Sequence, residues 1–199
     1  MSTLLYVQSS IFGEAGQSSQ LAQALIQDWQ AQNPAGEVIV RDLASAPLPQ
    51  LDAQRFQAFT STPDQRTAAQ QDALELSDQL LEEVRRADML IVGVPMYNFG
   101  VPSQLKSWFD HLARAGVSFK YTENGPVGLL ENKPVLLLAT RGGLYREAGL
   151  DHEIPFVQQF FAFIGLSDTR VIYAEGLSMA EVREQSLDRA RQELARQLS

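Results

Sequence analysis

The stretch Met89-Leu90-Ile91-Val92-Gly93-Val94-Pro95-Met96-Tyr97-Asn98-Phe99-Gly100 decides the fold that we expect for this 199-residue chain. Its first six residues form a short apolar run, which is typical of a strand buried on both faces of a parallel sheet. Four similar runs lie at residues 4–7, 38–40, 135–139 and 171–173. Segments with apolar residues at helical spacing separate the runs. This alternation predicts an α/β fold with a doubly wound, five-stranded parallel sheet and helices on both faces.

Apolar spacing and end signals place the expected helices. They cover residues 21–29, 64–86, 102–112, 156–164 and a last segment that begins near Ser178. Ser178 and Glu181 have the spacing of a capping box. Residues 43–63 and 116–133 are long connections, and the first is expected to hold one helical turn or more. A chain of this length is expected to fold as one domain, residues 1–199.

The composition narrows the possible functions. A formal net charge of −8 opposes nonspecific binding to nucleic acid or to an anionic membrane, because phosphate groups would repel the chain. The absence of cysteine rules out disulfides, thiolate catalysis, iron–sulfur clusters and cysteine zinc sites. No apolar stretch is long enough to span a membrane, and the first residues predict a strand and not a signal peptide. We therefore expect a cytoplasmic protein with no nucleic-acid or membrane partner.

The loop after the first strand, residues 9–18, combines hydroxyl groups and glycines and leads into a helix. Unpaired N–H groups and the positive end of the helix dipole favour a phosphate at such a position. The loop has neither the Rossmann fingerprint nor a P-loop motif, and it contains no lysine or arginine, so neutral donors would hold the phosphate. The alternative is ordinary helix capping by Ser18 or Ser19.

The loop after the third expected strand, residues 95–100, places two aromatic side chains and an amide next to a buried strand. Exposed apolar surface at a sheet edge indicates that something flat covers it. Asn98 offers both a donor and an acceptor to the edge of a heteroaromatic ring. The alternative is that Tyr97 and Phe99 fold back onto the core.

The loop after the fourth expected strand reads Thr140-Arg141-Gly142-Gly143. Paired glycines let the backbone approach a ligand, and successive N–H groups can bind an anion, although a plain turn would also account for them. We expect the lone arginine to be solvated. Ligands of doubly wound sheets bind at the carboxyl ends of the strands, where these three loops would meet. Together the loops match the chemical outline of FMN.

Other chemistries fit the sequence less well. Ser178 lies between a strand and a helix, as a hydrolase nucleophile does, but both histidines precede it, which is the wrong chain order for that fold. Asp151, His152 and Glu153 could suggest a metal, yet the helix dipole explains the acidic residues. We expect His111 on or near an exposed helix face, and we expect no metal site and no catalytic side chain.

Several motifs together resemble one family, the FMN-dependent NADH azoreductases of bacteria, which are flavodoxin-like and also reduce quinones. The resemblance covers essentially the whole chain. Its motifs are Pro95-Met96-Tyr97-Asn98-Phe99, Thr140-Arg141-Gly142-Gly143, Ala113-Arg114-Ala115-Gly116-Val117 with Tyr121-Thr122-Glu123-Asn124-Gly125-Pro126, Phe163-Ile164-Gly165 and Ala174-Glu175-Gly176.

The resemblance implies a flavodoxin-like sheet, bound FMN and a homodimer with the active site at the subunit interface. The implied phosphate contacts are Ser10, Gln17, Ser18 and the backbone of Gly16, where the family often has serine. The implied contacts to the isoalloxazine and ribityl parts are Pro95, Met96, Tyr97, Asn98, Phe99, Thr140, Arg141, Gly142 and Gly143. Asn98, Tyr121 and Phe163 would line the substrate space.

The same resemblance implies a ping-pong reaction. NADH or NADPH passes a hydride to the flavin, and a quinone or azo compound then takes the same place and accepts the electrons, so the flavin carries the chemistry. One alternative is a flavodoxin-like electron carrier without substrate turnover, although the aromatic segment around Phe119 and Tyr121 argues against it. Another is an interaction protein on the same fold that binds no flavin.

Overall fold

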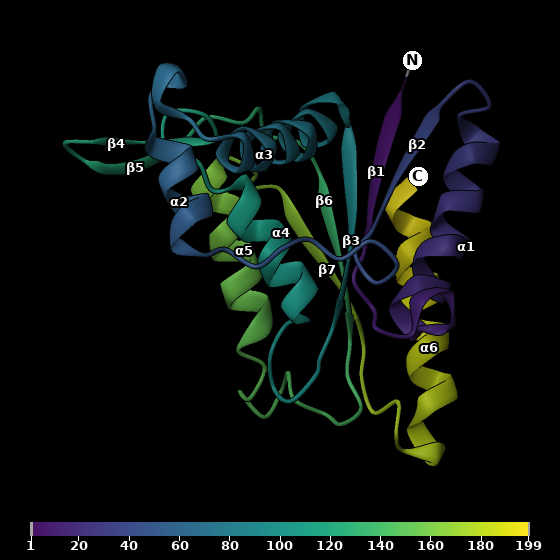
Figure 1. Ribbon diagram of the computed structural model, residues 1–199. Coiled ribbons are helices and arrows are strands. Elements are labelled where there is room, and N and C mark those ends of the chain that lie inside the picture. The colour runs from purple at the N-terminus through teal and green to yellow at the C-terminus, as the bar shows by residue number, and fades with distance from the viewer. Residues whose placement is uncertain (1, 199) are drawn as a thin grey trace.

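A five-stranded parallel sheet forms the centre of the computed structural model, which describes residues 2–198 (Figure 1). Its strands run in the order β2-β1-β3-β6-β7. They are β1 (Thr3–Gln8), β2 (Glu37–Asp42), β3 (Met89–Pro95), β6 (Val135–Thr140) and β7 (Thr169–Ala174). The chain passes from β1 outward to β2 and then returns to β3 on the other side of β1, so the strand order reverses between β1 and β3. The predicted doubly wound parallel sheet is confirmed.

Helices cover both faces of this sheet (Figure 1). One face carries α1 (Gln17–Gln32) and α6 (Ala180–Ala195), and the other carries α3 (Ala68–Arg86), α4 (Ser103–Leu112) and α5 (Glu153–Ile164). The short helix α2 (Ala53–Thr60) packs on α3. None of the helices described here is long and apolar enough to cross a membrane.

One predicted helix start and one predicted helix cap were wrong. The helix expected from residue 64 begins at Ala68, because Thr67 and Gln70 form a capping box there. The capping box expected at Ser178 and Glu181 does not form: α6 begins at Ala180 without a side-chain cap. The backbone N–H of Ser178 instead donates to the carbonyl of Gly142 at 3.0 Å, so this residue is drawn toward the loop after β6.

An antiparallel hairpin occupies part of the stretch that we expected to be irregular. It consists of β4 (Phe119–Thr122) and β5 (Gly125–Gly128), and it projects from the upper left of the molecule (Figure 1). The ring of Phe119 packs against that of Phe163 with centroids 4.2 Å apart. The backbones also meet, because a Cβ atom on Gly128 would lie 2.1 Å from the nitrogen of Gly165. The hairpin is therefore fixed to the end of α5.

Replacing Gly128 with alanine tests this contact. Because the added methyl group collides with backbone and not with a mobile side chain, we expect Gly128→Ala to lower the free energy of unfolding by about 1–3 kcal/mol. Urea unfolding measures the change. The control Val127→Ala alters the adjacent, half-exposed position and should have little effect. Equal losses in the two variants would contradict a close backbone contact at Gly128.

Candidate functional site

Three loops meet where β1, β3 and β6 end, and we call residues 9–16, 95–100 and 140–145 the carboxyl-edge loops. The Ser9 hydroxyl donates to the carbonyl of Gly93 at 2.7 Å, which joins the first loop to β3. The backbone N–H of Met96 donates to the carbonyl of Thr140 at 3.1 Å, which joins the second loop to the third. The loops thus lie at the point where the strand order reverses, which is the usual ligand position in such sheets.

The N-terminus of α1 is open to a ligand. The first helical hydrogen bond runs from the N–H of Gln20 to the carbonyl of Gly16 at 2.9 Å, so the amides of Gln17 and Ser18 precede it and point out of the helix end. No side chain caps this end, and the first turn contains no acidic residue. Ordinary capping by Ser18 or Ser19 is therefore wrong. Both serines are buried in the first turn. Because this turn has no acidic residue, the positive end of the helix dipole has no counter-charge there.

Glycine at position 16 is required by its neighbour. A Cβ atom there would lie 2.2 Å from the hydroxyl oxygen of Ser10 and 2.6 Å from its Cβ atom. The buried Ser10 hydroxyl lies 3.2 Å from that of Tyr97. A serine at position 16, which the resembling family often has, would displace this arrangement. Gly16 thus lets Ser10 approach the open helix end.

The loop after β3 is a tight turn with strained backbone. The backbones of Tyr97 and Gly100 exchange two hydrogen bonds, and the two residues between them have φ of 52° at Asn98 and 64° at Phe99. Positive φ at both central residues is typical of a type I′ turn, and bulky side chains rarely adopt it. The Phe99 side chain is 70% exposed, so its expected alternative of folding back onto the core is wrong. Tyr97 is half-buried and packs edge-on against Phe12 at 6.3 Å between centroids.

The glycine pair after β6 presents free donors. The carbonyls of Gly142 and Gly143 accept from the backbone of the β7–α6 connection, at 3.0 Å from Ser178 and 2.9 Å from Gly176. Within residues 2–198 the amide groups of Gly142 and Gly143 have no hydrogen-bond partner. Two adjacent free amides can stabilise negative charge on a ligand.

Arg141 departs from expectation, because its side chain is 1% exposed and not solvated. It points into the protein, where it donates to the carbonyls of Val94 and Thr140 and pairs with Asp151 and Glu153. Only its backbone remains available to a ligand. The helix dipole is also an incomplete explanation of Asp151 and Glu153, since both carboxylates face this arginine. The described residues contain no cluster of acidic residues or histidines suited to a metal ion.

His111 was also placed wrongly, because its side chain is fully buried. Its Nε2 lies 3.0 Å from the carbonyl oxygen of Pro49, and the Ser77 hydroxyl donates to the His111 carbonyl at 2.6 Å. Burial lowers the pKa of His111, so the ring is neutral and donates from Nε2 to Pro49. This histidine ties the long β2–α2 connection to α4 and lies outside the carboxyl-edge loops.

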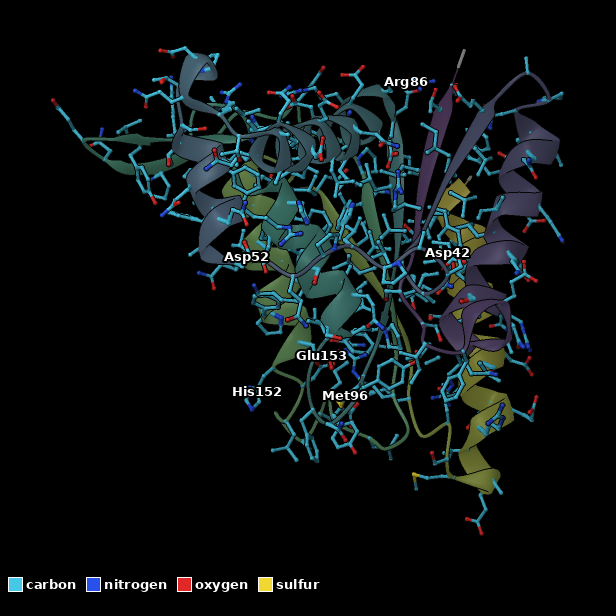
Figure 2. All side chains as sticks on the ribbon, in the orientation of Figure 1. Asp42, Asp52, Arg86, Met96, His152 and Glu153 are labelled. Carbon is cyan, nitrogen blue, oxygen red and sulfur yellow. The ribbon has the colours of Figure 1, made fainter. Side chains whose placement is uncertain are left out.

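Tyr121 and Phe163 do not join the carboxyl-edge loops of their own chain. Figure 2 shows Glu153, the first residue of α5, beside Met96 at the lower end of the sheet. Phe163 lies ten residues further along α5, about 15 Å away at a rise of 1.5 Å per residue. The exposed Tyr121 lies on β4 against Phe119, in the hairpin at the upper left of Figure 1. Within a single chain, Tyr121 and Phe163 therefore lie apart from the carboxyl-edge loops.

The strand order defines the class: a flavodoxin-like α/β protein, and proteins of this class generally bind ligands at the β1/β3 reversal, where the carboxyl-edge loops lie. A family described as having the flavodoxin-like fold matches residues 2–198, and the chain belongs to it. It is 49% identical over 199 residues to the FMN-dependent NADH:quinone oxidoreductase of Cellvibrio japonicus, covering all of both chains. It is 49% identical over 192 residues to the enzyme of that name from Alcanivorax borkumensis, covering 96% and 97% of the two chains. The crystal structure of an azoreductase from Bacillus anthracis superposes with a TM-score of 0.91 at 27% identity, covering 100% and 99%.

The strained turn gives a prediction about stability. Glycine adopts positive φ without the Cβ clash, so Phe99→Gly is expected to leave the free energy of unfolding unchanged or to raise it by up to about 1 kcal/mol. The control Phe56→Gly removes a similarly exposed phenylalanine, 59% against 70% for Phe99, from the helix α2 and is expected to cost about 1 kcal/mol. Urea unfolding of the flavin-free protein compares them. A loss at Phe99 as large as that at Phe56 would mean that the turn is not strained.

Proposed function

We propose that this protein is an FMN-dependent NADH:quinone oxidoreductase that also reduces azo compounds, by a ping-pong reaction in one slot. The names of its relatives support the proposal. The observation that carries it is the meeting of three features at one edge: an open helix end at Gln17, an exposed aromatic at Phe99 and free amides at Gly142 and Gly143. We also propose a cytoplasmic location, which the cysteine-free composition supports.

The residues present fit FMN. The amides of Gln17 and Ser18, the hydroxyl of Ser10 and the backbone of Gly16 would hold the phosphate by neutral hydrogen bonds and the helix dipole. The carboxyl-edge loop after β3 would hold the ring through the Pro95 and Met96 backbone, the Tyr97 and Phe99 rings and the Asn98 amide. The loop after β6 would complete the site with Thr140, the Arg141 backbone, Gly142 and Gly143.

The protein's part in the reaction is binding and electrostatics. FMN, when bound, supplies a centre that accepts a hydride from NADH or NADPH and passes electrons to a quinone or azo compound. The Gly142 and Gly143 amides would stabilise negative charge at the ring edge nearest to them, because they need no reorganisation to do so. Phe99 and Asn98 would contact the flat substrates, and no protein nucleophile is required.

The position of Tyr121 and Phe163 supports a homodimer. Their role in lining the substrate space cannot be fulfilled within one chain, because α5 and the hairpin carry them to the opposite end of the sheet. A second copy would have to bring its own Tyr121 and Phe163 to the carboxyl-edge loops. Each site would then combine the loops of one subunit with the hairpin and α5 end of the other.

The visible spectrum tests the flavin chemistry. Protein incubated with FMN and desalted is expected to retain flavin absorbance, which NADH bleaches without oxygen and which a small quinone restores. NADPH and an azo dye are run in parallel. Retained flavin that NADH cannot bleach would favour an electron carrier instead. Failure to retain FMN would contradict the flavin site and leave the interaction protein as the explanation.

Subunit mixing tests the shared site. Gly142→Val disables the flavin loop in one subunit, and Tyr121→Ala with Phe163→Ala disables the other contribution in its partner. If each site is shared, a heterodimer of the two has one intact site and is expected to show about half of the wild-type quinone reduction. Affinity tags separate it from the impaired homodimers, which serve as controls. If each subunit built its own site, both sites of the heterodimer would carry a defect and no activity would return.

A further inference from the structure

A buried ion cluster lies directly beneath the carboxyl-edge loops. Arg141 is its cation, and Asp151 and Glu153 are its two carboxylates, with side chains at most 4% exposed. Figure 2 shows Glu153 beside Met96, at the end of β3. Nothing in the proposed chemistry uses this cluster, although buried charge is costly and needs a physical reason.

Arg141 ties three elements together at this place. Its Nη1 donates to the carbonyls of Val94 at 2.6 Å and Thr140 at 3.0 Å. Val94 lies in the end of β3, just before the turn with Phe99, and Thr140 ends β6, just before the glycine pair. Its Nε donates to Asp151 at 3.0 Å, just before α5. One side chain thus fixes the roots of the two loops that would hold the flavin ring.

The cluster has one cation for two carboxylates, and the two carboxylates differ in the hydrogen bonds that they accept. Asp151 accepts from Arg141 and from the backbone N–H groups of Glu153 and Ile154, at 3.0 and 3.3 Å. Glu153 has an oxygen 3.0 Å from Nη2 of Arg141, but among residues 2–198 neither of its carboxyl oxygens accepts a hydrogen bond. An ionised Glu153 would therefore be a poorly compensated buried charge.

The surroundings make Glu153 titrate near neutral pH. Burial raises the pKa of Glu153, the charge of Arg141 lowers it and the charge of Asp151 raises it, and together they bring this pKa to about 7. A cavity of about 440 Å³ lined by Glu153, His152 and, on α4, Lys106 reaches as far as Phe99. Lys106 is already paired with Asp110 at 2.6 Å. On β7, Tyr173 interacts with Asp151 and Arg141, and burial raises its pKa, so it stays neutral.

We infer that Arg141 is a positioning residue of the flavin site and that Glu153 controls it by gaining or losing a proton. With Glu153 protonated, Asp151 alone balances the arginine, whose Nη1 stays on the Val94 and Thr140 carbonyls. Ionisation gives the buried cluster a net charge of −1. The arginine is then drawn toward the second carboxylate and away from the Val94 and Thr140 carbonyls, which loosens both loop roots.

The sign of the pH dependence follows from the raised pKa. A carboxyl whose pKa is higher in the folded than in the unfolded protein stabilises the fold below its ordinary pKa of 4.5, and this stabilisation is lost as the pH rises through about 7. Loop order and FMN affinity are therefore expected to fall between pH 6 and pH 8.5. The inference rests on the proposed flavin site and deepens it.

The experiment compares wild type with Glu153→Gln, Arg141→Lys and the control Glu181→Gln, which removes an exposed carboxyl from the first turn of α6. Quenching of FMN fluorescence gives the dissociation constant from pH 6 to 8.5. FMN's own phosphate titrates near pH 6 in every variant, so only differences between variants count. Between pH 6 and 8.5, the FMN dissociation constant of wild type and of Glu181→Gln is expected to rise about tenfold more than that of Glu153→Gln. Tenfold corresponds to a change of about one unit in the pKa of Glu153 when FMN binds.

Hydrogen exchange in the flavin-free protein is the second readout. Lysine keeps the charge of Arg141 but not its planar fork of donors, so Arg141→Lys is expected to bind FMN more weakly at every pH. Its amide exchange should accelerate at Met96, Tyr97, Gly100 and Arg141, whose amides are hydrogen-bonded in these loops, and not in the hairpin, residues 119–128. Acceleration spread evenly over the chain would mean a merely structural role and would overturn the inference.

The outcomes separate this inference from the proposed function. Parallel pH profiles for wild type and Glu153→Gln would overturn control by Glu153 while leaving the flavin site intact. Absence of FMN binding by wild type at every pH would overturn both. If Arg141→Lys does not fold, Glu153→Gln still decides, because glutamine keeps the shape of the protonated glutamate.

Discussion

The reversal of strand order between β1 and β3 is the constraint on which the rest of this molecule depends. In sheets of this kind, connections that leave adjacent strands toward opposite faces leave the edge between them uncovered, and ligands bind there. The reversal between β1 and β3 sends α1 and α3 to opposite faces and brings the uncapped end of α1 to this edge. The reversal of strand order thus sets both the arrangement of helices on the sheet and the position of the proposed site.

The sequence predicted the parts of this structure that local pattern controls. The five strands are short apolar runs between helical periods, and each loop lies directly after its strand, so fold and loop positions followed together. The hairpin from Phe119 to Gly128 was missed, because each of its strands has only four residues and β5 consists of two glycines, a proline and a single valine, a composition untypical of a strand. They are held by Phe163 and Gly165, far along the chain. The cofactor role of the loop residues remains a prediction.

Arg141 and His111 show why burial of polar residues escapes sequence reasoning. Each was expected near solvent because single polar side chains usually are. Each is buried because partners distant in sequence satisfy it: Asp151 lies ten residues from Arg141, and Pro49 lies 62 residues from His111. Nothing in the local sequence around either residue encodes those partners. Only the packing of α5 and of the β2–α2 connection supplies them.

The proposed site has buried contacts on its inner side and exposed groups on its solvent side. On the inner side, Arg141 joins the ends of β3 and β6, and two backbone hydrogen bonds hold the strained turn at Phe99. On the solvent side, the amides of Gly142 and Gly143 have no hydrogen-bond partner within the described chain, and Phe99 is 70% exposed. Strain and exposed apolar surface persist in a fold only when the rest of the structure can support them. Arg141 and the paired backbone bonds would thus keep the loops in place for the proposed flat ligand and for the proposed side chains of a second subunit.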